Sequence, residues 1–65
     1  MSPSGDIQYF FQVERMVLEH QLKAALHRTS VLRARAASQN NAHGAEQALR
    51  LERILLHSQR RLSKL

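Results

Sequence analysis

The densest run of apolar side chains lies between Ile7 and Leu22 and contains every Phe and Tyr of the chain. At 3.6 residues per turn, these apolar side chains fall on three adjacent lines along a helix. The lines are Phe10, Val13 and Val17; Phe11, Leu18 and Leu22; and Tyr9 with Met16. A helix that is apolar around so much of its circumference must be covered from several sides.

The spacing of helix breakers divides the chain into two helices. No Gly or Pro occurs between Asp6 and Ala37, and good helix formers dominate there, so we expect one helix over about 6–37. The run 38–44 contains both central asparagines and Gly44, which tolerate left-handed backbone, and it predicts a turn with Asn41 as the next N-cap. A second helix is expected over about 45–64. The predicted fold is all-α, a single antiparallel two-helix hairpin over 1–65, completed by a partner or by self-association.

The two predicted helices carry matching apolar stripes with alternating spacings of four and three, as in a coiled coil. In the first helix this pattern combines two rows: Phe11, Leu18, Ala25 and Leu32 with Arg15, Leu22, Thr29 and Ala36. The expected hairpin core consists of Leu18, Leu22, Ala25, Leu32, Leu51, Leu55 and Leu62.

The second helix is too short to cover the first. With the turn centred near Asn41, Leu65 reaches only Val17, so the segment from Ile7 to about Met16, roughly 15 Å of helix, overhangs. A hairpin also covers only one side of each helix. We therefore expect an apolar surface that docks on a partner. Its predicted residues are Tyr9, Phe10, Phe11, Val13, Met16, Val17, Leu26, Leu49 and Leu56.

Length and composition make this need for a partner stronger. A chain of 65 residues buries little surface and usually requires disulfides, metal, oligomerisation or a partner, and it contains no cysteine. No apolar run approaches the roughly 20 residues of a membrane span, and no secretory signal is expected, because the first six residues lack a basic region and acidic residues lie inside the apolar segment that follows. The expectation is a soluble, cytoplasmic protein.

Charge is distributed unevenly. The net charge is +5, and nine of the ten Lys and Arg residues lie from Lys23 onward. The arginines are candidates for phosphate contacts on RNA or DNA. They fall at several helical angles without interleaved aromatic residues, which favours a solvated or protein-contacting face over nucleic acid. Those of interest are Arg28, Arg33, Arg35, Arg50, Arg53, Arg60 and Arg61.

No catalytic, cofactor or metal site is predicted. His20 and His27 are seven residues apart, whereas helical metal sites use spacings of three or four with several carboxylates. The chain has no phosphate-binding glycine loop and no nucleophile elbow. We expect no enzymatic activity.

Two apolar blocks resemble a known family. Gln21-Leu22-Lys23-Ala24-Ala25-Leu26 and Ala48-Leu49-Arg50-Leu51-Glu52 with Ile54 and Leu55 resemble blocks before and after the turn in the small two-helix co-chaperones of bacterial type III secretion needle subunits, the YscE-like family. The resemblance spans roughly residues 19–65. It implies a bacterial cytoplasmic protein that pairs with a helical-repeat chaperone, so that together they keep the needle subunit soluble and unpolymerised. The positions that match for partner contact are Leu22, Ala25, Leu26, Leu51 and Leu55. The arginine content and the aromatic opening depart from the family.

The alternative prediction is a homodimeric four-helix bundle, in which two hairpins cover one another and arginine-rich faces bind RNA or DNA. A stable dimer with steeply salt-dependent RNA binding favours this alternative over the co-chaperone.

Overall fold

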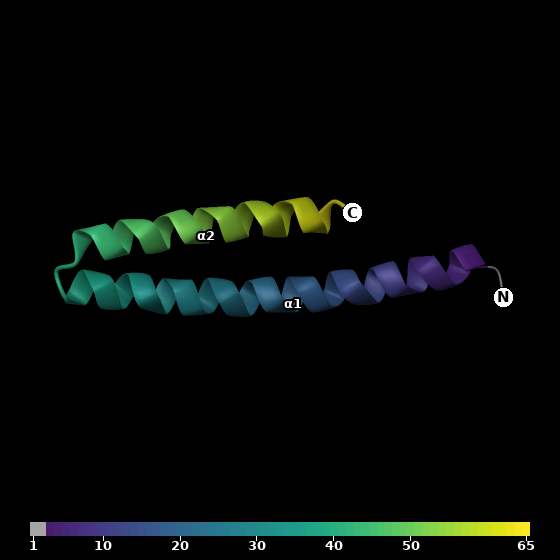
Figure 1. Ribbon diagram of the computed structural model, residues 1–65, viewed down its shortest axis with the longest axis horizontal. Coiled ribbons are helices and arrows are strands. Elements are labelled where there is room, and N and C mark those ends of the chain that lie inside the picture. Colours follow the sequence, from purple (N-terminus) through teal and green to yellow (C-terminus); the bar gives the residue numbers. More distant parts are fainter. Residues whose placement is uncertain (1–2) are drawn as a thin grey trace.

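The structure is a computed structural model that describes the backbone of residues 3–65 and the side chains of residues 5–65. It consists of two helices, α1 (Pro3–Ser38) and α2 (Ala42–Ser63), which lie antiparallel and pack against each other along α2 (Figure 1). No strand occurs in the part described. The all-α hairpin predicted from the sequence is confirmed.

Helix α1 is one uninterrupted helix of 36 residues. It begins at Pro3, three residues before the expected start, because proline is well tolerated in the first turn, where its missing N–H would have no partner. It also continues through the β-branched stretch at Thr29. There the Thr29 hydroxyl donates a hydrogen bond to the carbonyl oxygen of Ala25 at 2.7 Å, which satisfies a polar group on the packed side of the helix.

The turn is closed by two consecutive asparagines. Asn40 adopts left-handed backbone with φ 57°, and the N–H groups of Asn40 and Asn41 donate to the carbonyls of Ala37 and Ala36. This pair of bonds is a Schellman motif with Asn in the place that Gly usually takes. The Asn41 side chain then accepts a hydrogen bond from the Gly44 N–H at 2.9 Å, which confirms Asn41 as the N-cap of α2.

The seam between the helices is narrow. Among residues 5–65, only Ala48 and Thr29 are buried, at 6% and 7% exposure. The remaining seam is formed by half-buried side chains that follow a four–three spacing on both helices. On α1 these are Arg15, Glu19, Leu22, Leu26 and Ala36, and on α2 they are Ala45, Glu52, Leu55, Gln59 and Leu62.

The expected hairpin core is corrected in part. Leu22, Ala25, Leu55 and Leu62 are half-buried. In contrast, Leu18, Leu32 and Leu51 are 39%, 54% and 52% exposed and lie beside the seam. The seam row of α1 runs through Glu19, Leu22 and Leu26, so Leu18 and Leu32 lie one position to its side.

One ion pair joins the helices. Arg33 Nε lies 3.1 Å from Glu52 Oε1, and the Glu52 side chain is only 12% exposed whereas that of Arg33 is 46% exposed. The carboxylate therefore sits in the seam, and the guanidinium reaches it from the edge. Such a pair favours one register of α2 on α1 over its neighbours.

Helix α2 covers slightly more of α1 than expected. Leu65 lines an open depression with Phe11, Gln12 and Arg15, beyond the predicted limit at Val17. The tight turn explains the difference, because counting equal rises from Ser38 and Ala42 places Leu65 level with Arg15. The start of α1 still extends past the end of α2 (Figure 1). No helix in the described part is both long enough and apolar enough to span a membrane.

Candidate protein-interaction surface

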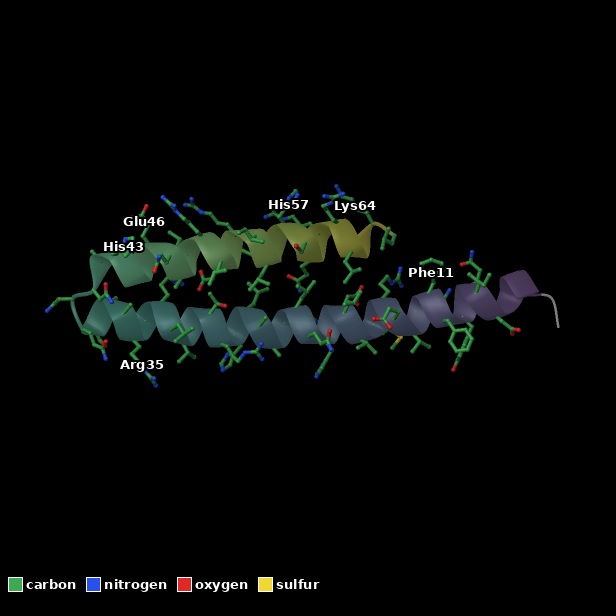
Figure 2. The ribbon with its side chains drawn as sticks, viewed as in Figure 1. Phe11, Arg35, His43, Glu46, His57 and Lys64 are labelled. Atoms are coloured by element: carbon green, nitrogen blue, oxygen red, sulfur yellow. The ribbon has the colours of Figure 1, made fainter. Side chains whose placement is uncertain are left out.

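The free start of α1 presents aromatic side chains to solvent. Tyr9, Phe10 and Phe11 are each about two-thirds exposed, and the rings of Tyr9 and Phe10 meet edge to face with centroids 5.6 Å apart. Ile7, Phe10, Phe11 and Glu14 line one open, mostly apolar depression. Figure 2 shows Phe11 on the part of α1 that has no neighbouring helix. Aromatic rings held on a rigid helix are the side chains that most often anchor protein interfaces.

The structure separates the nine predicted partner-binding residues into two groups. Seven of them are exposed and available to another protein: Tyr9, Phe10, Phe11, Val13, Met16, Val17 and Leu56. The other two, Leu26 and Leu49, are half-buried at the hairpin seam. Leu26 occupies the seam row between Leu22 and Thr29, so the hairpin itself covers much of its surface.

A second apolar stripe runs along α1 beside the seam. It consists of adjacent apolar pairs that repeat every seven residues: Phe10 with Phe11, Val17 with Leu18, Ala24 with Ala25, and Val31 with Leu32. We call these eight residues the outer stripe. The six bulky members are exposed, and the two alanines are half-buried. A seven-residue apolar repeat on a helix is the pattern that another helix recognises.

One polar residue follows each apolar pair of the outer stripe, so these residues also recur every seven positions. These residues are Glu14, Gln21, Arg28 and Arg35. All four are exposed, and Arg35 points away from α2 in Figure 2. This row therefore lies on a side of α1 that its own second helix does not cover, with a negative charge near one end and positive charges near the other.

The seven-residue repeat of the outer stripe is visible in the sequence, but the sequence does not show that the stripe lies outside the hairpin. The four–three pattern along α1 fits two neighbouring choices of seam, and the choice that collects the most apolar residues places Leu18 and Leu32 inside the hairpin. The structure uses the other choice, with Glu19, Leu26 and Arg33, and leaves the leucines outside. The exposed residues Val31, Leu32, Ile54 and Leu65 consequently join the apolar surface, although they were not predicted as partner-binding.

The outer side of α2 is polar. His43, Glu46, His57 and Lys64 project from this side, away from α1 (Figure 2). Glu46 pairs with Arg50 along the same helix at 3.0 Å. Within residues 3–65, no three His, Asp or Glu side chains gather into a set that could hold a metal ion.

The residues that carry the family resemblance lie mostly inside the hairpin. Leu22, Ala25, Leu26 and Leu55 are half-buried and Leu51 is exposed. Comparison of the chain with protein-family models, with curated proteins and with solved structures finds no match.

Proposed function

We propose that the chain is a protein-interaction module whose apolar surface is covered by a helical partner. The observation that carries this proposal is the exposed area. The molecule exposes 5551 Å², whereas a compact protein of 7.5 kDa exposes about 4,200 Å². The difference, roughly 1,300 Å², exceeds the area that one protein contributes to an ordinary interface, about 800 Å².

Within this class, we propose a co-chaperone of type III secretion as the specific role. The support is the two-helix build, the absence of cysteine and the resemblance of the two apolar blocks. In this role the chain stabilises a helical-repeat chaperone in the bacterial cytoplasm, and the pair holds a needle subunit unpolymerised. The free aromatic end of α1, centred on Phe10 and Phe11, is the anchor for the chaperone.

The test is co-expression of the full chain with the helical-repeat protein and the needle subunit encoded beside it. We expect a stable complex on gel filtration and no needle polymer. The double variant Phe10→Ala/Phe11→Ala should weaken the complex by at least about 2 kcal/mol, roughly 30-fold in Kd, while circular dichroism stays unchanged. His57→Ala is the control, because His57 is exposed on the polar outer side of α2 and projects away from α1.

Three results contradict the proposal. Failure of the chain to bind a helical-repeat chaperone contradicts the partnership. Equal weakening of binding by the aromatic and control variants contradicts the anchoring role of Phe10 and Phe11. Tight RNA binding that falls steeply between two salt concentrations assigns the molecule to the nucleic-acid regulators instead.

A further inference from the structure

We propose that the outer stripe of α1 is a self-association surface, on which the α1 helix of a second copy packs antiparallel about a two-fold axis beside Gln21. This proposal does not depend on the function proposed above; because both contacts use Phe10 and Phe11, the chaperone and the second copy would exclude each other at this end of α1. It rests on the repeat of the stripe, on its charges and on the shape of its centre.

The apolar pairs of the stripe match one another in this register. Phe10 and Phe11 meet Leu32 and Val31 of the second copy. Closer to the axis, Val17 and Leu18 meet Ala25 and Ala24. Each large side chain at the starting half of one helix thus faces a smaller one at the turn half of the other, which is the complementarity that close helix packing requires.

The polar row selects the antiparallel orientation. About the axis at Gln21, Glu14 of each copy faces Arg28 of the other, and the two Gln21 amides face each other and can exchange hydrogen bonds. In a parallel pair, by contrast, Arg28 would face Arg28 and Arg35 would face Arg35. Like charges at matching positions of two helices are unfavourable.

The apolar pairs select the register. Moving the axis by half a repeat toward the turn aligns Phe10 and Phe11 with Gln39 and Ser38, so both rings lose their apolar partners. Moving the axis by half a repeat toward the start aligns Val31 and Leu32 with Ser4 and Pro3, which do not belong to the stripe. Only the axis at Gln21 pairs all eight residues of the stripe.

The centre of the stripe has the shape that this packing needs. Leu18, Gln21, Ala24, Ala25 and Arg28 line an open depression in the middle of α1. The small side chains of Ala24 and Ala25 leave this hollow, and in the dimer Val17 and Leu18 of the second copy fill it. Small residues at a crossing point allow two helix backbones to approach closely.

The first experiment measures the mass of the full chain in solution by light scattering after gel filtration. We expect twice 7.5 kDa. Glu14→Arg and Arg28→Glu should each weaken dimerisation by about tenfold, because two symmetric pairs become like-charge contacts, and the double variant should recover it. Arg53→Glu changes the net charge as Arg28→Glu does, but from an exposed position on α2, and should have no effect.

The second experiment tests the register with single cysteines, for which the cysteine-free chain is a clean background. Across a two-fold axis only residues beside the axis face their own copies, so Gln21→Cys should form an intermolecular disulfide on mild oxidation. Val31→Cys, in the same stripe but far from the axis, should not. A parallel pair would cross-link at both positions.

A monomeric chain, or a dimer unaffected by Glu14→Arg, would overturn the proposal. Efficient cross-linking through Val31→Cys would also overturn it. The chaperone assay described above is a separate measurement. A dimeric chain that does not bind the chaperone contradicts the proposed function but not the dimer. A monomeric chain that binds the chaperone contradicts the dimer but not the proposed function.

Discussion

Asn40 and Asn41 perform different tasks in the turn although they are chemically identical. Asn40 supplies the left-handed backbone that ends α1, and Asn41 supplies the side-chain oxygen that begins α2. Asparagine is among the few residues that suit both tasks, because its short amide can bond to nearby backbone groups. Gly44 makes room for the cap, since a Cβ at this position would lie 2.7 Å from the Asn41 amide nitrogen.

At this residue scale, Asn40→Ala is expected to lower the free energy of unfolding by about 1 kcal/mol, because alanine adopts positive φ at a steric cost. Asn40→Gly should cause no loss, since glycine adopts this conformation freely. Urea unfolding followed by circular dichroism, at one fixed protein concentration, measures both. Equal losses for the two variants would show that the backbone of residue 40 does not limit stability.

At the scale of the two helices, the seam is held by small and half-buried residues. The Arg33–Glu52 pair is the one ion pair between helices in the described residues. The Glu52 carboxylate is largely removed from water, so a side chain of the opposite charge at this position would be poorly solvated and would have no partner. The pair therefore contributes to the register of the hairpin more than to its total stability.

We expect Glu52→Arg to destabilise the hairpin by about 1–2 kcal/mol, because two guanidinium groups then meet at the seam. The exchanged variant Arg33→Glu/Glu52→Arg should recover most of this loss in thermal unfolding. Glu46→Arg is the control: its pair with Arg50 is exposed, and losing it should cost less than about 0.5 kcal/mol. Failure of the exchange to restore stability would mean that Glu52 acts through packing.

Sequence reasoning predicts the two helices, the turn and the Asn41 cap because each depends on residues close together in the chain. The rotation of α1 about its own axis is different. It depends on how the small seam residues of the two helices, among them Thr29 and Ala48, pack against the opposite helix, and this packing has no local signal. Counting apolar residues favours the row of Leu18 and Leu32, whereas the thin hairpin tolerates Glu19 and Arg33 at its open edges. The predicted surface therefore included the free end of α1 and Val17, but it omitted Val31 and assigned Leu18 and Leu32 to the hairpin core.

At the scale of the whole molecule, the hairpin is long and thin, with principal extents of 58 × 15 × 11 Å. Its radius of gyration is 16.4 Å, compared with about 11 Å for a compact domain of this length. A body this thin has almost no interior, so most of its apolar side chains are covered only when another molecule lies beside it.

A molecule with this shape should gain stability from association. We expect the melting temperature of the full chain to rise with protein concentration, because the dimer dissociates on dilution and its stabilising contacts are lost. Thermal unfolding followed by circular dichroism over a wide concentration range measures this. Arg53→Glu should retain the dependence and Glu14→Arg should reduce it, whereas a melting temperature independent of concentration would indicate a monomer that is stable alone.

The position of Tyr9 has an optical consequence. The chain contains one Tyr and no Trp, and this Tyr is exposed and lies six residues before Arg15, the residue level with the end of the chain. Its near-ultraviolet absorbance and its fluorescence therefore report the environment of the free end and of no other part of the protein. A titration that shifts this signal identifies docking at the aromatic end without any added label, and a signal that stays constant while the mass increases places the contact elsewhere on the hairpin.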